Sequence, residues 1–195
     1  MYPDGVADLL NDGGTRMPAP TTDYNNEPDR AVAWERDCRM ATVLSHTESE
    51  ELVALEGDLT EAYSHTCDRV IRKMSFEPKA GECGVFTVED LVVAKSEDFE
   101  KAFHLHTMSE PTIEGNVITV EHKGGCLRCT VLEPANAEIT AIGGGENRFT
   151  LNGIPIPSEK TDHRECGWGQ IIISPRDAKR EHRFKVRMEI LDAEL

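Results

Sequence analysis

The residues Phe184-Lys185-Val186-Arg187-Met188-Glu189-Ile190 alternate apolar and charged side chains without interruption. Successive side chains of a β-strand point to opposite faces of the sheet, so the four apolar residues are predicted to face a core and the three charged ones to face solvent. Residues 70–76 alternate in a similar way and place Met74 and Phe76 on one side. Strands with one solvated face are typical of antiparallel sheets.

Short runs rich in Val, Ile, Leu, Phe and Thr recur from about Val43 onward, separated by Gly, Pro, Asn and acidic residues. Turn sequences at 114–116 and 123–125 predict two hairpins. Helical spacing of apolar residues is confined to 58–66 and 177–182. The predicted strands are residues 41–46, 52–55, 68–76, 84–94, 102–107, 117–122, 126–132, 138–142, 148–151, 169–173 and 184–191. We therefore expect an all-β fold, a two-layer antiparallel β-sandwich with many short strands and little helix.

The first 40 residues differ from the rest of the chain. They contain four prolines and several Gly and Asn residues, and they show no sustained helical or strand period. Such composition is typical of irregular or extended chain. The predicted organisation is an irregular, linker-like segment at residues 1–40 followed by one β-sandwich domain at residues 41–195.

Charge and hydropathy exclude several classes of protein. The 195 residues carry 21 Lys and Arg against 36 Asp and Glu, a formal net charge of −15. Because phosphate contacts need clustered cations, this balance argues against a nucleic-acid partner. The longest apolar runs, at 91–94 and 171–173, are far shorter than the ~20 residues that span a bilayer, so no membrane partner is expected. Residues 1–5 lack the features of a signal peptide.

Six cysteines offer little metal-binding geometry. Cys126 and Cys129 have the spacing of half a zinc knuckle, but they lie in a predicted strand, where residues three apart face opposite sides. The other four cysteines are scattered singly, at positions 38, 67, 83 and 166. A structural zinc is therefore not predicted, and both disulfides and buried free thiols stay open.

His104 and His106 lie two residues apart in a predicted strand, so their side chains share one face. The pair could chelate a metal, but no acidic residue of the run completes a site, and hydrogen bonding along the sheet is favoured. Tyr63 and His65 offer a phenol and an imidazole for acid–base chemistry, although a turn at the end of a short helix explains them equally well. Gly143-Gly144-Gly145 lacks the Lys and Ser or Thr of a phosphate loop and indicates a turn.

One locally basic stretch interrupts the acidic chain. Residues 176–187 contain six Lys and Arg residues beside two acidic residues and His182. The stretch could contact an acidic sugar, but a solvated strand at the edge of a sheet is the favoured interpretation.

Several segments together resemble the heparinase II/III-like polysaccharide lyases. In chain order they are residues 57–64, 70–76, 103–107 with Glu110-Pro111, 113–116, 132–134, 142–145 and 167–175, and residues 11–14 with Arg16 resemble a linker of that family. The order and spacing match as well. One departure is Leu91, where many relatives have Arg after Asp90, which puts a local ion pair in doubt.

The resemblance implies the C-terminal β-sandwich of an enzyme that cleaves acidic, uronic-acid-containing polysaccharides by β-elimination. In that family most of the catalytic groups come from an N-terminal α/α toroid, and some members hold zinc through residues of an early sandwich strand. Those motifs match no residue here. We therefore assign no catalytic, cofactor-binding or metal-binding residue to this chain and expect no cofactor in it.

The implied function is that of a lyase portion that is inactive without its toroid domain. The implied partners are that domain and an acidic polysaccharide, and the implied location is secreted or periplasmic. A stand-alone carbohydrate-binding or structural module is the alternative, with Trp34, Trp168 and Tyr63 as stacking residues, although Trp168 between two glycines favours core packing. A small independent lyase using Tyr63 and His65 is a third possibility. Truncation would leave an apolar face uncovered, which predicts self-association.

Overall fold

The computed structural model describes residues 41–64, 66–79, 82–144, 150–151, 154–155 and 168–192. All strand pairs in these residues are antiparallel. The proposed linker at residues 1–40 lies outside this range, so the predicted domain boundary stays a prediction. Within the described residues no helix has the length and apolar character needed to cross a membrane.

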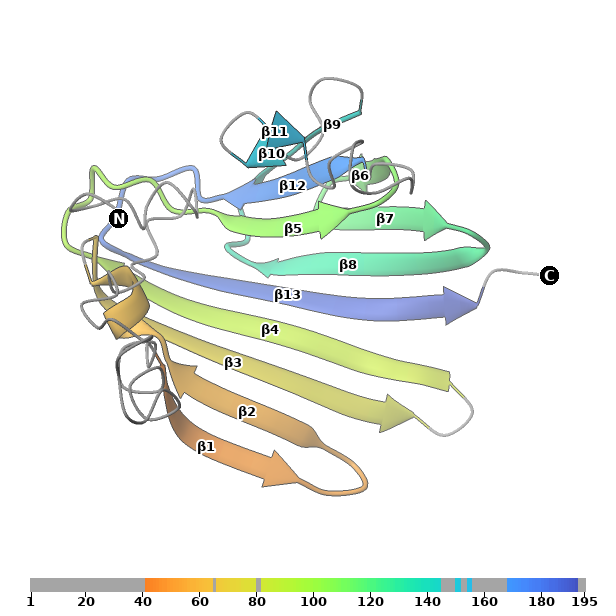
Figure 1. Ribbon diagram of the computed structural model, residues 1–195, viewed down its shortest axis with the longest axis horizontal. Coiled ribbons are helices and arrows are strands. Elements are labelled where there is room, and N and C mark those ends of the chain that lie inside the picture. The colour runs from red at the N-terminus through yellow and green to blue at the C-terminus, as the bar shows by residue number, and fades with distance from the viewer. Residues whose placement is uncertain are drawn as a thin grey trace, which may run out of the picture.

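Two sheets form the layers of a sandwich, and a two-stranded ribbon is separate from both (Figure 1). The eight-stranded sheet has, in spatial order, β1 (Thr42–Glu48), β2 (Val53–Asp58), β3 (Cys67–Lys79), β4 (Glu82–Ala94), β13 (Glu181–Asp192), β8 (Gly125–Glu133), β7 (Val117–His122) and β6 (Pro111–Glu114). The three-stranded sheet has the order β5 (Phe103–Thr107), β12 (Gly169–Ser174) and β9 (Glu138–Gly143). The ribbon pairs β10 (Thr150–Leu151) with β11 (Ile154–Pro155). The predicted all-β sandwich is confirmed.

The core lies between the three-stranded sheet and the β4, β13, β8 and β7 strands of the large sheet. Its buried members are Val88, Phe103, Ile118, Val120, Cys129, Val131, Ile171, Ile173, Phe184 and Val186. The alternation predicted at 184–190 therefore holds for Phe184 and Val186, whereas Ile190, farther along β13, is exposed. Burial of this apolar surface is the main force that holds the two layers together.

The large sheet extends beyond the three-stranded sheet that covers it, because β1 and β2 lie at the side farthest from β5, β12 and β9 (Figure 1). Side chains directly opposite in antiparallel strands share one face of the sheet. One such row consists of Val53, Phe76, Phe86, Met188, Cys129 and Ile118. Its exposure rises from 0% at Ile118 and 1% at Cys129 to 36% at Phe86, 37% at Phe76 and 39% at Val53. The core face of the large sheet is thus sealed at one side and open at the other.

Two sequence predictions about this fold are wrong. The basic stretch ends in β13, which lies between β4 and β8 inside the large sheet and not at an edge. Apolar and charged residues alternate along β13 while the strand pairs with β4 on one side and β8 on the other. A charge on its outward face forms an ion pair with the neighbouring strand, since Lys185 Nζ lies 3.0 Å from Glu89 Oε1. Residues 177–182 are not helical either, since they form the connection into β13, whose first two residues already pair with β4. The predicted helix at 58–66 is reduced to one 3-10 turn, η1 (Thr60–Tyr63).

Candidate functional site

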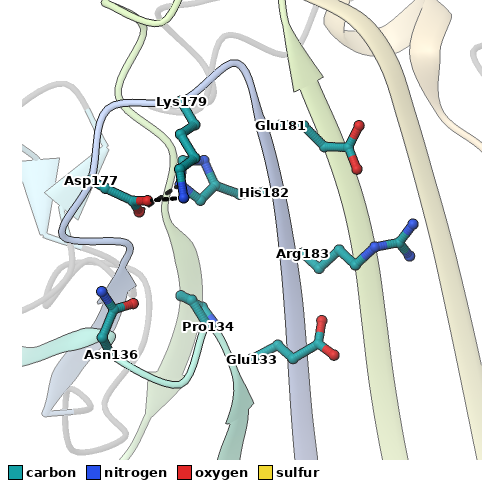
Figure 2. Close-up of a pocket in the computed structure, with 8 residues that line it drawn as sticks. All are labelled: Glu133, Pro134, Asn136, Asp177, Lys179, Glu181, His182 and Arg183. Atoms are coloured by element: carbon teal, nitrogen blue, oxygen red, sulfur yellow. Dashed lines mark hydrogen bonds and ion pairs between the residues drawn. The ribbon is translucent and has the colours of Figure 1, made fainter.

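A shallow hollow of about 360 Å³ lies where the β8–β9 turn approaches the start of β13 (Figure 2). Its wall on the β8–β9 side carries Glu133, Pro134 and Asn136. The opposite wall comes from the β12–β13 connection and the first residues of β13. It carries Asp177, Lys179, Glu181, His182 and Arg183.

Asp177 is held by Lys179 of the same connection and by His182 of β13 (Figure 2). Lys179 Nζ lies 2.5 Å from Asp177 Oδ2, and His182 Nε2 lies 3.1 Å from Asp177 Oδ1. The hydrogen bonds from Lys179 and then His182 lower the pKa of Asp177 to about 2. A carboxylate with so low a pKa is a poor proton acceptor near neutral pH. The cluster therefore fixes the connection in place and does not form a general base.

His182 is enclosed because it is the first core-facing residue of β13, opposite Val92 of β4. Its Nδ1 atom is buried and has no hydrogen-bond partner among the described residues. Around it, Glu133, Asp177 and Glu181 outnumber Lys179 and Arg183, so the hollow is a poor site for a polyanion. Its polar groups suit recognition of a neutral polar group better than acid–base catalysis.

The structure separates the two cysteines of the knuckle-like motif. Cys129 is buried in the core, and its burial raises the pKa of its thiol to about 11. Cys126 is half-buried three positions earlier in the same continuous strand, so it faces the other side. Cys67, Cys83, Cys126 and Cys129 are all free thiols. Cys38 and Cys166 lie outside the described residues.

His104 and His106 share one face of β5 as predicted. That face is the outer one, since Phe103 and Leu105 of the strand pack on the core. His104 Nδ1 lies 3.1 Å from Oε1 of Gln170 on β12. Nowhere in the described residues do three or more His, Cys, Asp or Glu side chains gather in a way that could hold a metal ion. The described residues therefore do not fit the zinc that the family resemblance allows.

Trp168 lies just before β12 and is half-buried. It contacts Gly143 on the side that Ile139 and Ala141 of β9 turn to the core, which agrees with the favoured interpretation of core packing. Its half-buried ring lies over Gly143 and Gly144, the first two residues of the predicted Gly143-Gly144-Gly145 turn. Gly145 lies outside the described residues, as do Trp34 and His65. The proposed pairing of Tyr63 with His65 is thus untested.

The ion pair of Arg72 with Asp90 was not predicted from the sequence. Leu91 puts a local ion pair of Asp90 in doubt, but Asp90 faces the core side of β4 and is bound by Arg72 of β3. The pair could have been predicted from the two-residue spacing of strand side chains. Arg72 shares the face of Met74 and Phe76, and Asp90 shares the face of Val88. A cation and an anion at core-facing positions of adjacent strands predict a pair.

No family model and no curated protein sequence matches the chain. Solved structures share its fold. Heparan sulfate lyase HepC from Pedobacter heparinus is 12% identical over 80% of this chain and 22% of its own length, with a TM-score of 0.52. A mutant of that enzyme is 14% identical over 78% of this chain and 22% of its own length, with a TM-score of 0.53. The heparinase III BT4657 gene product with methylated lysines is 9% identical over 91% of this chain and 28% of its own length, with a TM-score of 0.51. This chain thus spans only 22–28% of those chains.

Proposed function

We propose that this chain is the β-sandwich portion of a polysaccharide lyase that resembles heparinase II/III and that it completes an enzyme whose catalytic residues lie elsewhere. The observation that carries the proposal is the asymmetry of coverage. The similarity takes in 78–91% of this chain but only 22–28% of the heparinase III chains. The proposed substrate class is an acidic polysaccharide, and the proposed location is secreted or periplasmic.

The chemistry of the described residues agrees with a chain that is silent alone. β-Elimination at a uronic acid needs a base for the C5 proton, an acid for the leaving oxygen and a cation that neutralises the carboxylate. In the polar hollow, Asp177 is tied to Lys179 and His182 is enclosed. The catalytic groups are therefore proposed to come from a helical toroid domain.

The open side of the large sheet supports the need for a partner. Val53, Phe76 and Phe86 lie on the core face of the sheet, yet each is more than a third exposed. Apolar side chains in one contiguous row gain stability when another surface covers them. That surface is proposed to be the toroid domain or, in its absence, a second copy of this chain.

The decisive experiment begins with the in-frame DNA upstream of the Met1 codon. We expect it to encode a helical domain. The chain extended by that domain and the 195-residue chain are then incubated with heparan sulfate and with alginate, and unsaturated uronate products are followed by ultraviolet absorbance. Turnover by the extended chain alone is expected. Turnover by the 195-residue chain, or an upstream region without a helical domain, would overturn the proposal.

The second candidate is a stand-alone carbohydrate-binding module. The partial exposure of Trp168 favours it, because sugar-binding surfaces use exposed or half-exposed aromatic rings as stacking platforms. Binding of an oligosaccharide by the 195-residue chain, with no helical domain encoded upstream, would support this second function over the first.

A further inference from the structure

The strand β1 forms an open edge of the large sheet. Among the described strands it pairs only with β2, and it lies outermost in the sheet (Figure 1). All seven of its residues are exposed, including Val43 at 65% and Leu44 at 50%. The other strands at the edges of the two sheets, β5, β6 and β9, are shorter, and each has residues that are at least half-buried. Side-chain burial therefore contributes little to holding β1 in place.

Two residues of β1 direct their backbone N–H and C=O groups away from β2. Just beyond the strand, the Ser49 N–H donates to the Leu52 carbonyl oxygen at 2.9 Å. The backbone groups of successive residues in a strand point to opposite sides, so those of Thr47 also point toward β2. The groups of His46 and Glu48 then point to the open edge. Two donors and two acceptors are thus available to a further strand.

The edge lacks the residues that commonly protect an exposed strand. Lys and Pro in edge strands hinder pairing with another chain, and β1 contains neither. The bulge of β1 lies at Leu44, and the register is regular from Ser45 to Glu48. At the opposite edge of the same sheet, β6 has only four residues and begins with Pro111. The β1 edge is therefore the one suited to strand addition.

Local charge selects the kind of strand that can be added. Residues 41–58, which contain β1, β2 and the turn between them, have five acidic residues and no Lys or Arg. Pairing of β1 with a second copy would bring two such acidic hairpins together, and like charges on adjacent strands are destabilising. A basic strand would place opposite charges beside Glu48, Glu50 and Glu51.

We propose that the β1 edge binds an extended, basic segment of another protein as an additional strand of the large sheet. The backbone groups of His46 and Glu48 form the hydrogen bonds, and the acidic residues of the β1–β2 hairpin select a basic partner. In strand addition the main chain supplies affinity and the side chains supply specificity. This surface is the edge of the sheet and is separate from the apolar row on its core face, so it does not depend on the lyase proposal.

The test uses the isotope-labelled 195-residue chain and a capped nine-residue peptide in which Lys and Val alternate. One control peptide has Glu in place of Lys. A second has Pro in place of every other Val, so it keeps the charge but loses backbone donors. The Lys–Val peptide is expected to bind in calorimetry, more weakly at high salt, and to slow amide hydrogen exchange at His46 and Glu48. Absence of binding, or equal binding of the proline peptide, would overturn the proposal.

Variants at one position separate backbone pairing from side-chain contact. His46→Pro removes an N–H that faces the open edge and leaves the bonds to β2 in place, a position where edge strands tolerate Pro. We expect it to raise the dissociation constant for the Lys–Val peptide at least about tenfold. His46→Ala keeps the N–H, so it is the matched control and should leave affinity unchanged. Equal affinity of the two variants would contradict strand addition.

A charge variant keeps the test valid if His46→Pro fails to fold. Glu50→Gln combined with Glu51→Gln is expected to weaken binding of the Lys–Val peptide at least about threefold. Glu97→Gln combined with Glu100→Gln removes the same charge from the β4–β5 connection and should leave affinity unchanged. Equal weakening by the two pairs would show that only the net charge of the chain attracts the peptide, which would overturn the proposal.

Amide exchange without peptide tests the competing occupant. If the His46 amide becomes protected as the protein concentration rises, a second copy occupies the edge and the proposal is wrong. None of these measurements involves turnover, so the lyase proposal and the β1 proposal can fail independently.

Discussion

Arg72 and Asp90 form a bidentate ion pair across β3 and β4, with Arg72 Nε 2.7 Å from Oδ1 and Nη2 2.6 Å from Oδ2. The Asp90 residue is only 7% exposed. The Arg72 guanidinium also lies 5.8 Å from the centre of the Phe103 ring of β5. Since Phe103 belongs to the three-stranded sheet and stacks with Phe184 of the large sheet, Arg72 links both layers at the border of the core.

Arg72→Ala is expected to lower the free energy of unfolding by about 2–3 kcal/mol, because it leaves a buried carboxylate without its counter-charge. The value lies below that of a fully buried pair, since the Arg72 side chain is partly exposed. Urea denaturation measures the change. Lys185→Ala breaks the more exposed pair with Glu89 and serves as the control, with an expected cost below about 1 kcal/mol. Equal costs in the two variants would contradict this account.

Ile171 and Ile190 test where the core ends. Ile171 is 1% exposed at the centre of the three-stranded sheet, and Ile190 is 58% exposed near the end of β13. Ile171→Ala is expected to cost about 2–5 kcal/mol through lost burial and cavity formation. Ile190→Ala should change stability by less than about 0.5 kcal/mol. Thermal unfolding of the two variants checks the difference, and a large loss in Ile190→Ala would mean that β13 is covered at that end.

Gly169 is required by the close approach of β9 and β12. A Cβ atom there would lie 2.1 Å from the Ile142 carbonyl oxygen, so Gly169→Ala must displace backbone. We expect a cost of about 1–3 kcal/mol, as for other overpacked sites. Gly57→Ala is the matched control, because its added Cβ would lie 3.7 Å from the nearest atom. Urea midpoints should separate the two variants, and unchanged stability in Gly169→Ala would refute the predicted clash.

Asp177 should titrate at about pH 2 in the folded chain, below the ~3.9 of an unperturbed Asp. Its folded pKa is lowered, so its contribution to stability is present above about pH 4 and is lost as the pH falls through about 2. Carboxyl chemical shifts followed by NMR measure this pKa. Lys179→Ala should raise it, because the hydrogen bond from Lys179 is the largest cause of the shift. A pKa near 4 in the unmodified chain would show that the cluster does not form.

Self-association through the open side of the large sheet is expected when no other domain covers it. The net charge of −15 opposes association, so the apparent mass in sedimentation should rise with protein concentration and more steeply at high salt. Phe86→Glu, which places a charge in the exposed row, should restore a monomer. Phe99→Glu adds the same charge on the β4–β5 connection and should leave association unchanged. A monomer at all concentrations would count against an uncovered interface.

Most of the strands could be predicted because each is encoded in local alternation. The hairpins at Gly115 and Gly124 were also predictable, since both glycines adopt positive φ in tight turns. The segment at 177–182 could not be predicted in this way. Its conformation depends on Asp177 binding Lys179 and His182 and on β13 pairing with β4. Neither is visible in the periodicity of this six-residue segment, which has Ala178 as its only apolar residue.

The position of a strand within its sheet was equally inaccessible. Alternation at 184–190 indicates one buried and one solvated face, and both edge and central strands meet that description. Pairing with β4, 88–104 residues away, and with β8, 52–67 residues away, decided that β13 is central.

By itself the sequence determined the all-β class, the approximate strands and the inward residues of each, because side-chain alternation is a local property of the chain. The tertiary structure alone decided which strands are neighbours, that Arg72 meets Asp90, that the Trp168 ring lies against Gly143, and that the large sheet extends beyond its cover. These features depend on contacts between residues distant in sequence, whose free energy appears only when the two layers are assembled.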